Sequence, residues 1–487
     1  MYNTQTIEIL RKLDKDELKR FGDFLKSPFF NNSSFIVKIY EAAKKEYPAY
    51  TGSSLEPEKM FKKLYPSESF KDTRIRNLYA EFGNLLRKFL GYIEVESSEL
   101  EFDIFVANSL ARRNLGNISN KVINKTMEQY SGKIFWDDNY FLPMYSLYST
   151  YIQNLNAGSK DYTKEHYSTQ MRIQEVLIVL FFRELFILLS LQSFKKITPN
   201  AYTSKITIEE FTKVIDMKNL FTYLESSENP YAAYIKLHYL LYYFNENTVT
   251  EEEYYEIKKE LYKIIFDVMK QEAFSFIVTI IRAIFIKLIP IDKKFYGEIF
   301  ELSKLFCKLK IFPNKHVPYL ASGPFKDMFG PAVILMELDW AENFVKEYSQ
   351  YLMEDIREDQ YNYCMGNISF KRKNYELSLE YLNKIKMSEM SDKVNIRFFY
   401  MMNFIELKAY ENALSSLQTI RQFYNDRKDI PEIFAVLIPD AIKYFGEIIK
   451  CETEGIKLEP QIYAQAKDGR RYYHAKYVLG KMEKLML

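Results

Sequence analysis

The sequence contains little of what disulfide frameworks, metal sites and sharp turns require. Only 15 glycines and 15 prolines occur in 487 residues, which argues against a glycine-punctuated α/β or all-β fold. The three cysteines, Cys307, Cys364 and Cys451, lie far apart without metal or redox spacing, as is typical of buried thiols in a reducing compartment. The four histidines are equally scattered. We therefore expect no disulfide, no metal and no other cofactor.

The sequence also has only a small net charge and no long uninterrupted apolar run. The 67 basic and 65 acidic residues leave a formal charge of +2, too small to draw the whole chain towards nucleic acid or anionic lipid. The two most apolar stretches, 176–191 and 273–289, are interrupted by charged residues, so neither resembles a membrane span of about 18 or more apolar residues. The N-terminus carries charges where a signal peptide needs an apolar core. We expect a soluble cytoplasmic protein.

Motifs of the common enzyme classes are also absent. The sequence has no phosphate-binding glycine loop, no nucleophile elbow and no HExxH zinc motif. Arg183 and Arg282 are unusual because each interrupts an apolar helix, and a buried arginine must be paired or reach solvent. We expect these arginines to pair with a neighbouring helix, for example through a glutamate such as Glu184, or to anchor a ligand carboxylate deep in a groove. The sequence predicts a non-enzyme, and an all-α enzyme with an unrecognised site is the least favoured alternative.

Apolar and aromatic residues, in contrast, are plentiful. Hydrophobic residues make up 47% of the chain and aromatic residues 16%, and they recur at helical spacing, which predicts an all-α fold. We expect an N-terminal helical domain at 1–96, a degenerate helical-repeat region at 97–320, and regular repeats with C-terminal capping helices at 321–487. The glycine- and proline-rich stretch Ala321–Pro331 is interpreted as an inter-domain hinge or a long surface loop.

A fixed period is visible in the C-terminal region. Trp340, Tyr375 and Tyr410 follow one another at intervals of 35 residues. Three apolar residues follow in the same register: Phe344, Leu379 and Leu414. Such a period predicts helical hairpins that stack into a solenoid, because one hairpin cannot bury its own apolar stripe. An ordinary helical bundle with an accidental period is the alternative.

The middle copy, DQYNYCMGNISFKRKNYELSLEYLNKI at Asp359–Ile385, resembles the tetratricopeptide repeat (TPR). The resemblance assigns Gly366 to the small position where the two helices approach, Tyr375 to the start of the second helix, and Ser378 to the small position of that helix. It implies a right-handed α-solenoid of TPR-like hairpins.

The neighbouring copies match the repeat less completely. The next copy matches at four positions, Tyr410, Ala413, Leu417 and Ile420, but carries Met401 where a small residue is expected. The preceding copy keeps only Trp340 and Phe344. Its poorly matching positions are Asn343, Glu347 and Gln350.

In the tetratricopeptide family, the first helix of each hairpin lines a concave surface. The resemblance therefore implies a non-catalytic interaction or scaffold protein that binds a peptide or protein partner there. The residues of this predicted groove are Tyr363, Asn367, Phe370 and Lys371 in one copy, and Phe398, Met402 and Ile405 in the next. Their aromatic and methionine side chains would hold the partner, and lysine would attract an acidic group. Alternatively, the chain's own final helices cover these residues.

A second resemblance lies near the N-terminus. The segment LEPEKMFKKLYPSESFKDTRIRNLYAEFGNLLRKFLG is similar to the helix-turn-helix core of winged-helix transcriptional activators. It implies an alternative function, a DNA-binding regulator with a TPR-like sensing domain, in which Lys71, Arg74 and Arg76 approach the DNA. However, no alternating strand pair follows to form a wing, and four glutamates between residues 94 and 101 would repel phosphates. Solvated surface charges explain the three basic residues equally well.

Overall fold

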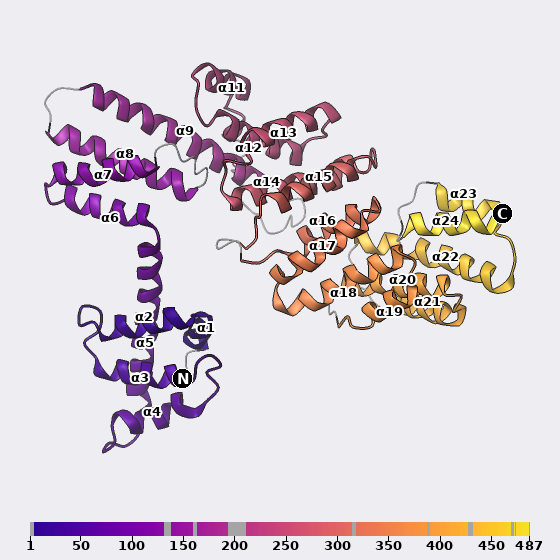
Figure 1. Ribbon diagram of the computed structural model, residues 1–487, viewed down its shortest axis with the longest axis horizontal. Helices are drawn as coiled ribbons and strands as arrows, with labels where there is room; N and C mark the ends of the chain where they lie inside the picture. Colours follow the sequence, from indigo (N-terminus) through magenta and orange to yellow (C-terminus); the bar gives the residue numbers. More distant parts are fainter. Residues whose placement is uncertain are drawn as a thin grey trace. The chain divides into compact units, whose positions relative to one another are not determined.

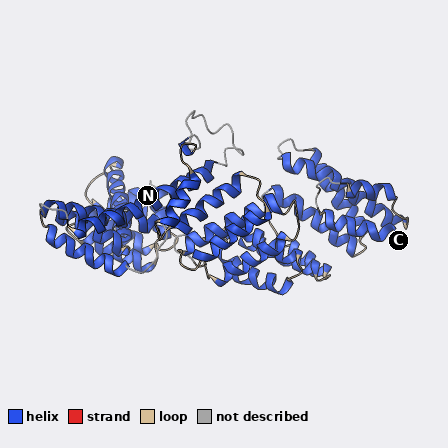
Figure 2. Ribbon diagram, turned by 90° about the horizontal axis from the view of Figure 1, so that it is seen from above, coloured by secondary structure: helices blue, strands red, loops and turns tan. Residues whose placement is uncertain are grey.

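Every regular element in the described part of the chain is a helix. The computed structural model (Figure 1) describes residues 4–130, 138–158, 163–192, 211–313, 318–386, 390–426, 432–468, 472 and 474–486. Within these ranges no strand occurs, and Figure 2 shows helices joined by loops. The predicted all-α class is therefore confirmed. None of the described helices is long and apolar enough to cross a membrane.

The chain forms two compact units, which are described separately. Unit 1 contains residues 1–133 and 139–177, and unit 2 contains residues 134–138 and 178–487. The expected boundary at 96/97 falls within unit 1, and the one at 320/321 falls within unit 2. The three-region division remains a prediction.

Unit 1 begins with helices that enclose a core of their own. These are α1 (Thr4–Lys12), α2 (Lys15–Lys26), α3 (Ser34–Lys45), the 3₁₀ turn η1 (Ser53–Leu55), α4 (Pro57–Leu64) and α5 (Asp72–Ser97). Phe21, Tyr40, Phe61 and Phe82 are among the fully buried residues of this core. Asp14 and Glu17 form a capping box that fixes the start of α2.

The remaining helices of unit 1 are joined by buried polar contacts. They are α6 (Glu99–Ala111), α7 (Gly116–Tyr130), α8 (Asp138–Gly158) and α9 (Lys164–Gln192), the last of which belongs to unit 2 from residue 178 on. Ser119 on α7 donates a hydrogen bond to the carbonyl of Ala107 on α6 at 2.9 Å. Asn154 on α8 donates in turn to the Ser119 hydroxyl at 2.9 Å, so the three helices are tied together.

Unit 2 is built mainly from consecutive helix pairs. Its further helices are α11 (Met217–Ser226), α12 (Ala232–Glu246), α13 (Glu251–Ile264), α14 (Lys270–Ala283) with the π-helical turn η4 (Ile284–Leu288), α15 (Phe295–Lys308), α16 (Ser322–Ile334), α17 (Leu338–Tyr348) with the 3₁₀ turn η5 (Ser349–Tyr351), α18 (Glu354–Lys371), α19 (Tyr375–Leu382), α20 (Met390–Glu406), α21 (Tyr410–Asn425), α22 (Glu432–Glu454), α23 (Pro460–Lys467) and α24 (Ala475–Met486). Each even-numbered helix from α12 to α20 packs on the helix that follows it. The first helices also contact one another, α12 with α14, α14 with α16, and α16 with α18. The hairpins are therefore layered.

Three consecutive hairpins of unit 2 have the same turn between their two helices, and this turn also joins α6 to α7 at Asn114 and α11 to α12 at Glu228. Met336, Lys373 and Lys408 have positive φ angles of 65°, 62° and 59°. In each turn, the next residue donates its backbone N–H to a carbonyl five residues earlier: Glu337 to Ala332 at 2.8 Å, Asn374 to Ser369 at 2.9 Å, and Ala409 to Phe404 at 2.9 Å. This is the Schellman arrangement, in which the left-handed position is usually glycine.

These turns correct the register of the first repeat copy. The left-handed residues are 37 residues apart between Met336 and Lys373, and 35 residues apart between Lys373 and Lys408. The expected equivalence of Trp340 with Tyr375 is therefore wrong by two residues. The residues five positions after each turn residue are small and fully buried in all three copies: Ala341, Ser378 and Ala413. The residues nine positions after it are apolar and buried in all three: Val345, Leu382 and Leu417. The interval between the first and second turns is two residues longer than the interval between the second and third turns. Positions taken 35 residues before those of the middle copy are therefore not equivalent to them, and this is why the first copy matched poorly.

Gly366 lies at a close approach of α18 and α19. The Ser378 hydroxyl donates to the Gly366 carbonyl at 2.9 Å. A Cβ atom on Gly366 would lie 3.3 Å from the Leu382 side chain and 3.5 Å from the Ser378 carbonyl oxygen. The next hairpin accepts Met401 at the equivalent position, where it is fully buried.

The stretch Ala321–Pro331 lies almost wholly in α16, so its interpretation as a long surface loop is wrong, and its interpretation as an inter-domain hinge stays a prediction. Phe325, Met328, Phe329 and Ala332 are spaced on one helical face and are all buried. Pro324 falls in the first turn of α16, where a missing N–H breaks no intrahelical bond. Because α16 contacts α14, α15, α17 and α18, this segment belongs to the core of unit 2.

Replacing Lys373 or Lys408 by glycine is expected to raise the free energy of unfolding by about 0.5–1 kcal/mol each, because the left-handed conformation strains a residue that has a Cβ atom. Both lysines are exposed, so little packing is lost. Alanine at the same positions is the control, since it removes the side chain but keeps the Cβ atom. Urea unfolding of the four variants checks this, and equal effects of alanine and glycine would contradict it.

Candidate functional site

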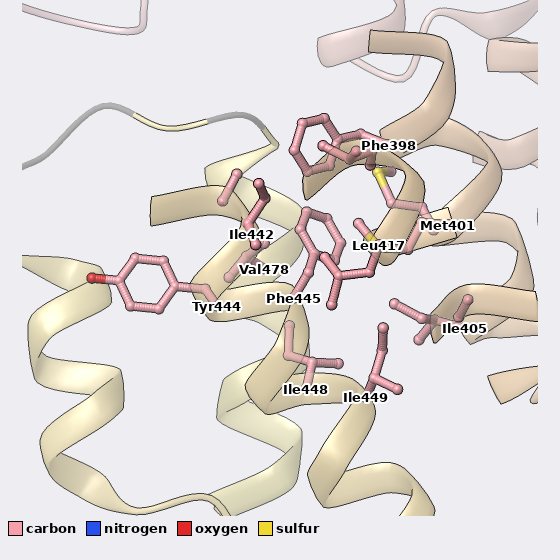
Figure 3. Packing of buried hydrophobic residues seen from close by; sticks show 14 of the residues in the cluster. Phe398, Met401, Ile405, Leu417, Ile442, Tyr444, Phe445, Ile448, Ile449 and Val478 are labelled. Atoms are coloured by element: carbon pink, nitrogen blue, oxygen red, sulfur yellow. The ribbon is translucent and has the colours of Figure 1, made fainter. Parts of the chain in front are cut away.

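Four of the seven predicted groove residues lie in the core. Phe370, Phe398, Met402 and Ile405 are each at most 7% exposed and belong to one apolar cluster with residues of α21, α22 and α24. Figure 3 shows Phe398 and Ile405 facing Phe445, Ile448 and Ile449 of α22. The ring centroids of Phe398 and Phe445 are 5.5 Å apart. These four residues are therefore not an open binding surface.

The last helix, α24, covers part of the predicted groove. The ring of Tyr477 lies 5.9 Å from the Phe370 ring and 6.0 Å from the Phe445 ring. Its hydroxyl lies 3.5 Å from the backbone carbonyl oxygen of Met402, to which it donates. α24 thereby shields apolar side chains of α18 and α22 from solvent.

The other three predicted residues are half-buried on α18. The Tyr363 hydroxyl accepts a hydrogen bond from the Asn395 amide of α20 at 2.6 Å. The Asn367 amide donates to the backbone carbonyl of Tyr363 at 3.3 Å. Burial, and then the charge of Lys476, lower the pKa of Lys371. These three side chains are thus partly exposed to solvent.

Successive first helices each carry one polar side chain that we group under the name polar row: Arg282, Asp327, Tyr363 and Asn395. They belong to α14, α16, α18 and α20. Arg282 is exposed and the other three are half-buried. Burial raises the pKa of Asp327 to about 6, although the positive charges of Arg282 and Lys326 oppose the rise. Arg282 is thus exposed at the edge of an apolar helix, and its charge also acts on Asp327.

Two glutamates fix α24 in place, and we name them the acidic pair, Glu406 and Glu452. The Lys481 ammonium lies 3.0 Å from a carboxylate oxygen of Glu406 and 3.9 Å from one of Glu452. The repeat tyrosines bind the same carboxylates, since Tyr375 donates to Glu406 at 3.5 Å and Tyr410 donates to Glu452 at 2.9 Å. Burial and the Glu452 hydrogen bond raise the pKa of Tyr410 to about 12.

Arg183 is paired inside unit 2. Its guanidinium is ion-paired with Glu184 on α9 and with Glu272 on α14, and its Nε atom donates to the Tyr234 hydroxyl at 2.9 Å. Arg183 and Glu272 are both 6% exposed. The expected pairing with Glu184 is present. The sequence did not indicate Glu272, because it lies 89 residues away from Arg183.

The three basic residues of the DNA-binding alternative lie at the start of α5, and each has an acidic neighbour. Glu68 pairs with Lys71 at 3.1 Å and with Arg74 at 2.9 Å. Asp72 pairs with Arg76 at 2.7 Å. The segment after α5, where a wing would stand, forms α6. DNA binding stays a prediction.

Among the residues that the structure describes, no cluster of histidine, cysteine, aspartate or glutamate is arranged to hold a metal ion. Comparison of the chain with protein families, with curated proteins and with solved structures finds no match.

Proposed function

We propose that the chain is a non-catalytic interaction protein, whose unit 2 is a right-handed, TPR-like α-solenoid that binds a peptide or protein partner along its first helices. The observation that carries this proposal is the layering of hairpins with equivalent turns at Met336, Lys373 and Lys408, and with first helices in mutual contact. Layered hairpins present side chains of successive first helices along one surface, which suits an extended ligand.

The polar row has the chemistry and the spacing for an extended peptide. Packed helices lie about 8–10 Å apart, and an extended chain advances about 3.3 Å per residue, so each first helix meets about every third residue of the ligand. Amide and hydroxyl groups such as those of Asn367 and Tyr363 both donate and accept hydrogen bonds, as a peptide backbone requires. Arg282 in the row and Lys371 beside it add positive charge, and Asp327 adds a half-buried negative charge, so we expect the ligand to carry an acidic residue that reaches Arg282.

Peptides selected from a random display library on the full-length chain are expected to carry that acidic residue. Replacing Arg282 by glutamate should then raise the dissociation constant about 10-fold or more, because a charge-assisted hydrogen bond contributes about 1.5–3 kcal/mol. The matched control is Arg421→Glu on α21, an exposed arginine of a second helix, which should leave affinity unchanged. Fluorescence anisotropy measures both.

Tyr363→Ala provides an independent variant of the same surface, and it too should weaken binding. If the library yields no binding peptide, or if Arg282→Glu, Tyr363→Ala and Arg421→Glu all bind like the wild type, the polar row is not the binding surface.

A further inference from the structure

The helix α24 presents one stripe of side chains to the rest of unit 2. Val478 and Met482 are fully buried, and Tyr477 and Lys481 make the polar contacts described above. These four residues occupy positions i, i+1, i+4 and i+5, which lie on one face of a helix. The stripe therefore consists of an aromatic and an apolar residue, two intervening residues, and then a basic and an apolar residue.

The surface beneath this stripe, which we name the α24-binding surface, consists of Phe370, Met402, Phe445 and the acidic pair Glu406 and Glu452. The side chains of Lys481, Glu406 and Glu452 are only 15%, 19% and 25% exposed, so the lysine neutralises two partly buried carboxylates. A helix that took the place of α24 would need a basic residue at the same position, since unpaired buried carboxylates are costly. It would also need an aromatic residue to cover Phe370 and Phe445.

At the N-terminal end of α24 the His474 ring packs on Phe398 and Phe399, but two positive charges lie near each other. Lys476 raises the positive potential around the half-buried Lys371, and this repulsion adds to burial in lowering the pKa of Lys371. The neighbouring His474 has a positive φ of 56°, which is strained for a residue with a side chain. Burial, and then the charge of Lys371, lower the pKa of His474 to about 4, so its ring stays neutral. A helix with a neutral or acidic residue in place of Lys476 would avoid this repulsion.

We infer that α24 is a replaceable internal ligand, and that the α24-binding surface receives an amphipathic helix from another protein. The partner helix carries the aromatic–apolar–x–x–basic–apolar stripe, and a neutral or acidic residue five positions before its basic residue. The inference rests on the proposed function, because it assigns a partner to the apolar part of the same first-helix surface. The negative charges of Glu406 and Glu452 favour a helix that carries a basic residue at the position of Lys481.

The test uses the full-length chain and a fluorescein-labelled peptide of residues 474–486 that carries Lys476→Glu. Lys481→Glu in the protein sets a glutamate beside the acidic pair, weakens the docking of α24, and should tighten peptide binding at least 10-fold relative to the wild type. Lys484→Glu is the matched control, because Lys484 is exposed on the same helix and should leave binding unchanged. A peptide that also carries Lys481→Glu should bind none of the three proteins.

Hydrogen exchange verifies that Lys481→Glu opens α24 while α18–α22 keep their protection. Met482→Glu, which introduces a charge at a fully buried position, provides a second way to open the helix. If α24 opens in either variant and the peptide binds no tighter, α24 is a permanent cap and the inference is overturned. If the wild type instead forms dimers that exchange α24, the occupant is a second copy and the inference is equally overturned. Either failure leaves peptide selection on the polar row intact, so the two proposals fail separately.

Discussion

Glu272→Leu is expected to lower the free energy of unfolding of unit 2 by about 3–5 kcal/mol, because it leaves the Arg183 guanidinium buried without its buried counter-ion. Arg183 and Glu272 join α9 to α14 and are both almost inaccessible to solvent. Burial disfavours the charge of Arg183, but Tyr234 and Glu272 outweigh that effect and keep its pKa above the usual value. The guanidinium therefore cannot escape by losing its proton. Urea unfolding followed by circular dichroism measures the loss.

Two controls separate burial of charge from loss of a contact. Glu184→Gln removes the other carboxylate partner of Arg183, whose side chain is 46% exposed, and should cost less than about 1 kcal/mol. The double variant Arg183→Met with Glu272→Leu removes both buried charges and should recover most of the stability lost by Glu272→Leu alone. If the double variant is as unstable as the single one, an uncompensated charge is not the cause.

Acidification is expected to destabilise unit 2 through His238. Burial, and secondly the charge of Arg183, lower the pKa of this histidine to about 3. Glu272 lies 3.9 Å from its Nε2 atom, beyond hydrogen-bond distance, and is already engaged by Arg183, so it does not restore the charged form. Below about pH 6.5 the unfolded chain binds a proton here that the folded chain excludes, and stability falls as pH falls. Between about pH 7.5 and pH 4.5 the loss amounts to about 2–3 kcal/mol.

His238→Phe should remove this part of the pH dependence while it keeps the edge contacts with the rings of Tyr234 and Phe276. The measurement is the difference in unfolding free energy between the two pH values, for the variant and for the wild type. His474, whose pKa is also lowered, adds to the acid loss, and Asp327, whose pKa is raised, acts in the opposite direction. Both contribute equally to the two proteins. An unchanged pH difference in the variant would contradict the assignment to His238.

Helical spacing and the repeat period predicted the all-α class and the C-terminal hairpins, because both depend on residues that are close in sequence. The turn residues Met336, Lys373 and Lys408 were not predicted, since none is the glycine that marks a left-handed position. Without them, the period was anchored on Trp340, which lies two residues away from the position equivalent to Tyr375. Glycine and proline in Ala321–Pro331 suggested a loop, but four buried residues on one face keep this segment helical.

The candidate site was less accessible to sequence reasoning because its contacts are long-range. Of the residues that the repeat pattern assigned to the groove, Tyr363, Asn367 and Lys371 are half-buried on α18. The repeat pattern could not show that α24 covers Phe370 and Met402. The contact between Tyr477 of α24 and Met402, for example, joins residues that are 75 positions apart in the sequence. The acidic pair was likewise invisible, because glutamates on helix surfaces are common and only the fold brings Glu406, Glu452 and Lys481 together.

The position of α24 on the first helices is tested most directly by a photo-crosslinking residue, benzoylphenylalanine, in place of Tyr477 in the full-length chain. The structure predicts crosslinks within one chain to α18, α20 and α22, at or next to Phe370, Met402 and Phe445. Crosslinks that avoid these three helices, or that join two copies of the chain, would contradict the proposed arrangement.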